Sequence, residues 1–206
     1  MNLEYLFPLI VPNDYYSRLA TWDLPHYRLP NSDFGLAWVF FEAEAAMTYL
    51  TRSEYEELES RQPNWQQRAF ENLRKSASDE EEFHTHFRMS NDEQRLLFIV
   101  FMNGDGIGSS RVLLSVELAA AFPQGYAVAF PDRSCGLAIA NDITDDELLE
   151  TLQLIGNMYE GATTAMARQI LAPSEVAVPS QWVQPIDSKL SQSLVEAVLK
   201  LSEKLD

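Results

Sequence analysis

The stretch that most constrains the fold of this chain spans residues 94–140. It opens with an apolar run, 95–102, that lacks polar alternation and so predicts a strand buried on both faces. A glycine-rich turn over 103–108 follows, and the apolar spacing of 109–121 then predicts a helix. Two short β-prone runs flank a turn at 131–134, which predicts a hairpin. This order of elements indicates an antiparallel sheet with helices packed on it.

The remaining segments extend this pattern into an α+β fold. We predict a mainly antiparallel sheet with packed helices, in the order ββ-α-ββ-α-ββ-α plus a C-terminal helix. Residues 1–172 form a single α+β domain with an N-terminal arm, 173–186 form a linker, and 187–206 form an amphipathic C-terminal helix. We favour a C-terminal helix that covers the domain's own core; the alternative is a seam for a homo-oligomer or another partner.

Local signals fix several boundaries. Thr51 with Glu54, and Thr144 with Glu147, have the spacing of capping boxes and predict two helix starts. The second helix is expected to run to about residue 170, with Leu152 in its buried stripe. Pro8 confines the first β-prone segment to a sheet edge, because proline cannot donate to a strand ladder.

Charge is the strongest compositional signal. The chain has 31 acidic and 15 basic residues among 206, a formal net charge of −16. Such a charge repels phosphate backbones and anionic lipid, so we expect neither nucleic-acid backbone binding nor membrane binding. A basic protein remains a suitable partner. The alternative is that the acidic surface serves solubility alone.

The location of the protein is predicted from its cysteine and its apolar segments. A single cysteine, Cys135, cannot form an internal disulfide, which fits a reducing compartment. The first residues lack the basic region of a signal peptide. No apolar run approaches the roughly 20 residues needed to span a bilayer. We therefore predict a cytoplasmic protein.

The glycine turn is the main candidate for a ligand site. A strand, a glycine loop and a helix start can bind phosphate, because the first backbone N–H groups of the helix are free. The glycine spacing lacks the last interval of the dinucleotide fingerprint, no P-loop lysine follows, and Asp105 would oppose an anion. A structural turn is therefore the favoured interpretation, in which Ser109 or Ser110 caps the helix. The candidate ligand-binding residues are Gly104, Asp105, Gly106, Gly108, Ser109, Ser110 and Arg111, with Asp132 and Arg133 from the neighbouring hairpin.

No set of residues predicts catalysis or metal binding. His84 and His86 share one face of a predicted strand, but the sequence offers no third ligand. Four consecutive acids at 79–82 cannot all converge on one ion. Cys135 lies near Arg133, yet it has no base nearby in the sequence, so a quiet buried thiol is favoured. We expect no catalytic residue, no metal site and no cofactor.

Several short motifs follow one another in a fixed order over residues 36–172. They are Tyr49-Leu50-Thr51-Arg52, Asn64-Trp65, Asn103-Gly104-Asp105-Gly106, Ser110-Arg111-Val112-Leu113 and Gly125-Tyr126-Ala127-Val128-Ala129-Phe130-Pro131. Taken together they resemble the uncharacterised YtpQ-like family of bacterial cytosolic proteins. The resemblance implies no established activity or ligand. Its element order is similar to that of the acidic α/β chaperones of secretion systems, which is an analogy of fold alone. This chain differs by a shorter amino-terminal region and an added terminal helix.

Two functional hypotheses follow. The first is a non-catalytic acidic interaction module, an adaptor, chaperone-like protein or immunity-type inhibitor, that binds a protein partner of basic character. The second is a nucleotide- or phosphate-binding protein, or an enzyme, that uses the loop from Gly104 to Ser110. The second hypothesis would lose its site if the loop and the Asp132–Arg133 turn lay at opposite ends of the sheet and no pocket formed between them.

Overall fold

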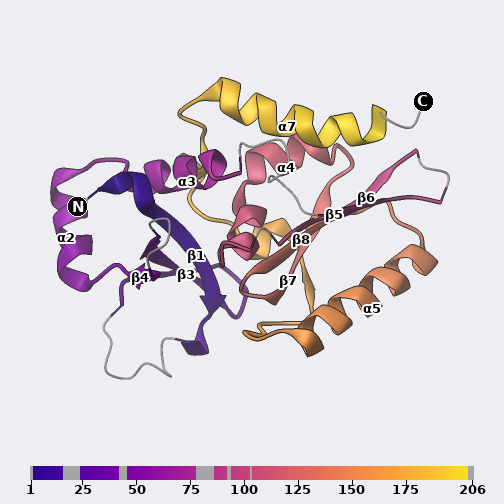
Figure 1. Cartoon of the computed structure of the whole chain (residues 1–206), viewed down its shortest axis with the longest axis horizontal. Helices are drawn as coiled ribbons and strands as arrows, with labels where there is room; N and C mark the ends of the chain where they lie inside the picture. The colour runs from indigo at the N-terminus through magenta and orange to yellow at the C-terminus, as the bar shows by residue number, and fades with distance from the viewer. Residues whose placement is uncertain are drawn as a thin grey trace.

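The computed structural model describes residues 2–15, 24–41, 46–77, 86–91, 94–102 and 104–203, and it places them in two antiparallel sheets with helices packed around them (Figure 1). The predicted α+β fold is confirmed. The strands are divided between two sheets, a detail that the strand pattern did not reveal. Within the described residues, no helix has the length and apolar character needed to cross a membrane.

The first sheet is built from the N-terminal segments. Its strands are β1 (Leu6–Pro12), β2 (His26–Arg28), β3 (Phe34–Phe40) and β4 (Thr48–Tyr49), preceded by the short helix η1 (Leu3–Tyr5). The order is β1-β3-β2, with β4 also paired to β3. β1 is therefore an edge strand, which confirms the prediction made from Pro8.

The second sheet contains the stretch that organises the sequence. Its strands are β5 (His86–Met89), β6 (Leu96–Phe101), β7 (Tyr126–Asp132), β8 (Cys135–Ala140) and β9 (Ile170–Leu171). They lie in the order β5-β6-β8-β7-β9, so the apolar β6 and β8 are interior strands. The hairpin predicted around residues 131–134 joins β7 to β8.

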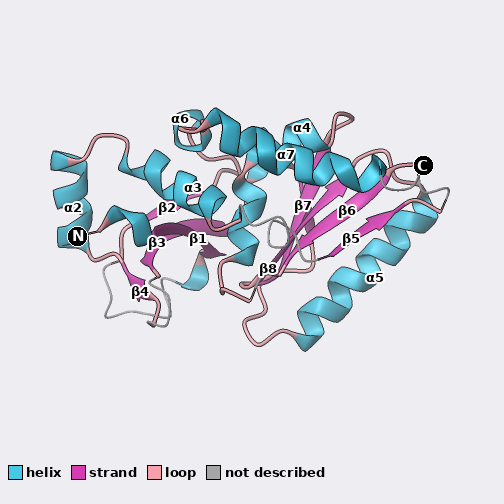
Figure 2. Ribbon diagram, turned by 45° about the horizontal axis from the view of Figure 1, so that its top comes forward, coloured by secondary structure: helices cyan, strands magenta, loops and turns pink. Residues whose placement is uncertain are grey.

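Helices cover both sheets (Figure 2). They are α2 (Arg52–Arg61), α3 (Trp65–Lys75), η2 (Gly108–Leu113), α4 (Ser115–Ala121), α5 (Asp145–Gly161), η3 (Pro173–Glu175), α6 (Ser180–Val183) and α7 (Ser188–Glu203). α3 packs on β1 and buries Trp65, Phe70 and Leu73. α5 lies on one face of the second sheet, and α4 and α7 lie over the other (Figure 1).

Two predicted helices have different bounds in the structure. The helix expected over 109–121 is divided into η2 and α4 at Leu114. The helix expected to reach residue 170 ends at Gly161. The chain beyond it pairs with β7 instead, where Met166 and Ala167 donate backbone hydrogen bonds to Pro131 and Phe130. Sheet pairing supplies backbone partners there that a longer helix would lack.

The C-terminal segments lie against the domain. In the segment predicted to be a linker, Trp182 packs with its ring centroid 5.5 Å from that of Trp38, and Val183 is buried. In α7, Leu194 and Val198 are buried against the rest of the chain, mainly at α4. The division of the chain into domain, linker and helix stays a prediction.

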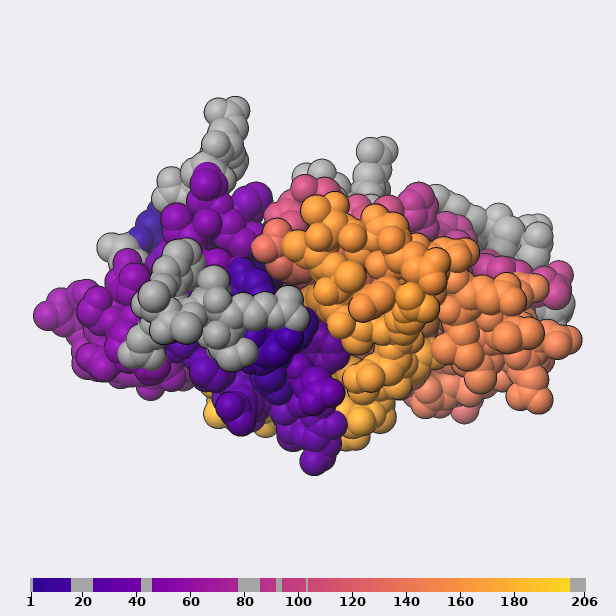
Figure 3. Space-filling model, turned by 90° about the horizontal axis from the view of Figure 1, so that it is seen from below, coloured from indigo at the N-terminus to yellow at the C-terminus, as the bar shows by residue number. Residues whose placement is uncertain are grey.

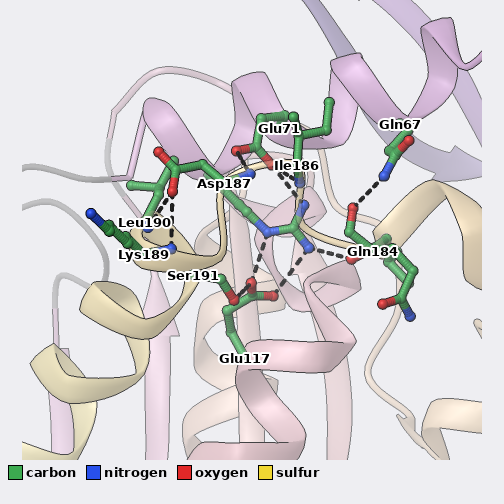
Figure 4. Close-up of polar contacts among 11 residues, drawn as sticks. Gln67, Glu71, Glu117, Gln184, Ile186, Asp187, Lys189, Leu190 and Ser191 are labelled. Carbon is green, nitrogen blue, oxygen red and sulfur yellow. Dashed lines mark hydrogen bonds and ion pairs between the residues drawn. The ribbon is translucent and has the colours of Figure 1, made fainter.

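A buried polar network joins α3, α4 and the start of α7 (Figure 4). Arg74 is fully buried, and its Nε donates to Glu117 Oε1 at 2.7 Å. Its guanidinium also donates to Glu71 Oε2 at 3.4 Å and to the Val183 carbonyl. Ser191 of α7 donates to the same Glu117 carboxylate. A single arginine thus holds three segments that are far apart in the sequence.

The network extends to the backbone that enters α7. The Glu71 carboxylate accepts hydrogen bonds from the backbone N–H groups of Ile186 and Asp187, at 3.1 and 3.0 Å. Asp187 then caps α7, since its side chain accepts from the backbone of Lys189 and Leu190 (Figure 4). Polar contacts as well as the apolar stripe therefore position the C-terminal helix.

Candidate functional site

The glycine turn has the backbone geometry that its glycines suggested. Gly104 and Gly106 have φ angles of +77° and +75°, in the left-handed region. Between them, Asp105 accepts from the backbone N–H of Ile107 at 3.1 Å and pairs with Arg111, whose Nη1 lies 3.2 Å from Oδ1. Arg111 is fully buried and also donates to Ser76 at 3.2 Å. The charge of Asp105 is therefore balanced inside the protein.

The two serines of the turn make structural contacts. Ser110 Oγ accepts a hydrogen bond from the backbone N–H of Ile10 at 3.1 Å, which ties the turn to β1. Ser109 Oγ donates to the Arg133 carbonyl. Both serines are fully buried, and neither caps η2, which begins after Ile107 without a side-chain cap. The predicted capping role of these serines is thus wrong, because long-range partners use their hydroxyl groups.

The two halves of the predicted site touch one another. A Cβ atom on Gly108 would lie 2.2 Å from the Ser134 carbonyl oxygen and 2.5 Å from that of Phe101. Gly108 is therefore required for the approach of η2 to the β7–β8 turn. The loop and the turn lie together, so the arrangement that would have removed the second hypothesis is not found.

Asp132 organises the turn between β7 and β8. Its carboxylate accepts from the backbone N–H groups of Ser134 and Thr164, at 2.8 and 2.9 Å, and from the Thr164 hydroxyl at 3.1 Å. Burial alone would raise the pKa of Asp132, but the hydrogen bonds from Ser134 and Thr164 outweigh it and lower the pKa. Asp132 is a stable anion with its oxygens occupied by neighbouring donors.

Arg133 differs from the other residues of the predicted site. Its backbone N–H donates to the Thr164 carbonyl at 3.2 Å. Its side chain is partly buried, and within the part of the chain that the structure describes it forms no ion pair. The Nε atom, like that of Arg111, is buried and has no hydrogen-bond partner among the described residues. Among the described residues, no carboxylate therefore balances the charge of Arg133.

Arg133 lines two surface hollows. The first has a volume of about 280 Å³ and lies between the end of β1 and residues 163–166, with Val11, Asp14 and Tyr15 in its wall. The second, of about 450 Å³, lies towards the end of α5, with Met102, Asn157 and Met158 in its wall. The segment that follows α5 thus passes between two concave surfaces that share one arginine.

Two tyrosines lie beside this arginine. The hydroxyl oxygens of Tyr15 and Tyr49 are 2.6 Å apart, and Tyr15 borders the first hollow. Burial and the hydrogen bond with Tyr15 raise the pKa of Tyr49, while the positive charge of Arg133 acts in the opposite direction. Tyr49 is therefore a neutral hydrogen-bonding neighbour of Arg133 at physiological pH.

The remaining reactive side chains have unremarkable surroundings. Burial, with a smaller contribution from Asp132, raises the pKa of the Cys135 thiol to about 12, so the thiol is protonated at neutral pH. His86 is exposed, while His84 and the acids at 79–82 lie outside the described residues. No group of three metal-ligating side chains forms among the residues that are described.

The outer face of α5, which we define as Asp145, Asp146, Leu149, Leu152, Gln153 and Glu160, is a feature that the sequence did not indicate. All six residues are exposed. Leu149 and Leu152 have 56% and 43% of their surface accessible. The helix packs on the sheet through Thr151 and Ile155, so Leu152 was assigned to the wrong face. The sequence did contain one indication of an exposed leucine on this helix, because Leu149 falls outside the apolar stripe that contains Leu148.

Comparisons with protein-family models, with curated proteins and with solved structures each find no match to this chain. The resemblance to the YtpQ-like family stays a prediction.

Proposed function

We propose that this protein is a non-catalytic acidic interaction module that binds a basic protein partner at the outer face of α5. The observation that carries the proposal is the exposure of Leu149 and Leu152 beside Asp145 and Asp146 on one helix face. α5 lies on the side of the molecule shown in Figure 3, where its orange surface faces the viewer.

Burial of the two leucines would supply the attraction. Leu149 and Leu152 lie three positions apart, so their side chains are neighbours on the helix surface. A helix face with adjacent apolar side chains suits a partner that presents an apolar ridge or groove. Apolar burial contributes about 25 cal/mol per Å², which makes such a pair of leucines a natural centre for a small interface.

The acids around the leucines would select the partner. Asp145 and Asp146 form no ion pair with another described residue, whereas Glu160 pairs with Arg168 at 3.1 Å. The same two aspartates stabilise the first turn of α5 through the helix dipole. With a net charge of −16, the protein attracts cationic surfaces and repels acidic ones. A partner with Lys or Arg residues around an apolar centre is therefore favoured.

The predicted loop site gives less support to the alternative hypothesis. The hydroxyls of Ser109 and Ser110 and the carboxylate of Asp105 have partners within the protein. The Cys135 thiol is buried and protonated at neutral pH. An adaptor, a chaperone-like protein and an immunity-type inhibitor all fit the proposed surface.

The test compares serine substitutions at two apolar residues that are equally exposed. Leu149 and Ile186 have the same accessible fraction, 56%, but only Leu149 belongs to the outer face of α5. A basic protein recovered from the native cell is titrated calorimetrically against the wild type, Leu149→Ser and Ile186→Ser. We expect Leu149→Ser to weaken binding at least ~10-fold, equivalent to ~1.4 kcal/mol, and Ile186→Ser to leave the affinity unchanged.

A second measurement tests the acidic character of the surface. Neutralisation by the pair Asp145→Asn and Asp146→Asn should reduce the association rate and flatten its dependence on salt. Equal affinities for Leu149→Ser and Ile186→Ser, or an acidic partner whose binding is insensitive to salt, would contradict the proposal.

A further inference from the structure

We infer that the hollow between β1 and residues 163–166, here called the Arg133 hollow, binds a small organic carboxylate through the Arg133 guanidinium. This site is distinct from the outer face of α5, since it is lined by other residues, among them Val11, Asp14, Tyr15 and Met166. The inference therefore does not depend on the proposed partner surface.

The arginines of this protein provide the first argument. Among the described residues, four other arginines are buried or partly buried, and each has a carboxylate partner: Arg74 with Glu117, Arg88 with Glu150, Arg95 with Glu147 and Arg111 with Asp105. Arg133 forms no ion pair within the described ranges, although acids outnumber bases two to one in the whole chain. An unpaired, partly buried guanidinium in an acidic protein is a place where an external anion can bind.

The desolvation of Arg133 provides the second argument. Its Nε is buried without a hydrogen-bond partner among the described residues, as is that of Arg111, but Arg111 has a carboxylate partner in Asp105 and Arg133 has none there. A buried donor without an acceptor destabilises the folded state, and a buried cation without a counterion does so more strongly. The guanidinium fork matches a carboxylate geometrically, so a bound carboxylate would restore the missing charge interaction.

The walls of the hollow indicate the size and class of the ligand. Its volume of about 280 Å³ suits a small molecule. Val11, Pro12 and Met166 give it an apolar side, while Arg133 and the exposed Thr163 give it a polar side. A small apolar or aromatic molecule that carries one anionic group fits a hollow with one apolar and one polar side.

Charge favours a carboxylate over a phosphate. The exposed Asp14 borders the hollow, and the protein as a whole has a net charge of −16. A single guanidinium balances the one negative charge of a carboxylate, whereas a phosphate group with nearly two charges would be repelled more strongly. The backbone at Thr164 is already bonded to Asp132, so it offers no additional donor to a phosphate.

The experiment is a titration of the full chain, labelled with ¹⁵N, with sodium benzoate and separately with sodium phosphate at constant ionic strength. With benzoate, we expect saturable shifts of the backbone amide signals of Arg133, Thr163 and Ala165. Arg133→Gln should weaken benzoate binding at least ~10-fold. Arg61→Gln makes the same change in net charge at an exposed position on α2 and should leave binding unchanged.

A second variant keeps the test decisive if Arg133→Gln does not fold. Thr163→Glu places a carboxylate at the exposed rim of the hollow and should abolish benzoate binding by repulsion. The inference is overturned if benzoate causes no saturable shifts, if Arg133→Gln binds as tightly as Arg61→Gln, or if phosphate binds at least as tightly as benzoate.

Discussion

Arg74 and Arg133 show how differently one fold can surround the same side chain. Arg74 is fully buried between α3, α4 and α7, and it donates to Glu117, Glu71 and the Val183 carbonyl. Arg133 is partly buried beside two hollows, and it forms no ion pair with a described carboxylate. The first arginine is enclosed by partners and the second is open to the surface.

This comparison assigns a structural role to the charge of Arg74 and makes the charge of Arg133 a candidate for a functional role. Removal of one member of a satisfied buried network leaves the other members uncompensated, so such a network resists substitution. An arginine without a carboxylate partner can be replaced at little cost to the fold, and a ligand can supply the missing charge. Stability measurements on matched variants can therefore distinguish the two regions.

The largest effect is expected for Arg74→Met. This change leaves Glu117 and Glu71 buried without their cation, which should lower the free energy of unfolding by ~3–5 kcal/mol. Urea unfolding monitored by tryptophan fluorescence measures it. Arg61→Met is the control, because Arg61 is an exposed partner of Glu57 and its loss should change stability by ~0.5 kcal/mol or less. Equal stabilities for the two variants would refute the structural role of Arg74.

The next effect is expected at the contact between η2 and the turn that holds Arg133. Gly108→Ala places a Cβ atom against the Ser134 and Phe101 carbonyls, and backbone atoms cannot move aside easily, so a loss of ~2–3 kcal/mol is expected. Gly104→Ala meets no atom within 4 Å and should lose only ~1 kcal/mol, the strain of its positive φ. Chemical denaturation ranks the stabilities of the two variants. A larger loss for Gly104→Ala than for Gly108→Ala would show that the close approach of η2 to the turn does not require glycine.

A smaller, pH-dependent effect is expected for Asp132→Asn. The pKa of Asp132 is lowered in the folded state, so its carboxylate stabilises the protein above the ordinary value of 3.8. That contribution is lost as the pH falls through the lowered pKa. Wild type and variant should differ by ~1–2 kcal/mol at pH 7 and converge in acid. The exposed Glu56→Gln is the control, and a gap that does not narrow as the pH falls below 3.8 would exclude this role for the charge.

The smallest effect is expected for Arg133→Met. An apolar side chain of similar length removes a cation and a buried Nε donor that have, respectively, no carboxylate and no acceptor among the described residues, so the free energy of unfolding should stay within ~0.5 kcal/mol of the wild type or rise. The measurement is the same urea unfolding used for Arg74→Met. A decrease of more than ~2 kcal/mol in the free energy of unfolding would show that Arg133, like Arg74, stabilises the fold.

Several features of the fold could be predicted because they depend on neighbours in the sequence. Both capping boxes, Thr51 with Glu54 and Thr144 with Glu147, form as expected. The interior position of β6 follows from its unbroken apolar run. The turn between β7 and β8 also lies where its residues indicated. Each of these depends on interactions within a few residues or on one strand's burial.

The site was predicted less completely, because its decisive contacts join distant segments. The partners of Ser109 and Ser110 are Arg133 and Ile10, 24 and 100 residues away. The sequence left open whether the loop lies beside the turn, and the roles of its side chains could not be inferred. The exposure of Leu152 depends on which face of α5 meets the sheet.

The α+β class and the acidic character of the chain could be inferred from the sequence, because periodicity, capping and charge are local or additive properties; the order of elements could not, since β9 and α6 and the division of α2 from α3 were absent from the predicted order. The tertiary structure alone decided which charges are balanced. Arg74, Arg111 and Arg133 are equivalent in the sequence, and only the approach of Glu117 to one and Asp105 to another distinguishes them. Ion pairing depends on distance in space, so only the folded chain shows that Arg133 has no carboxylate partner among the described residues.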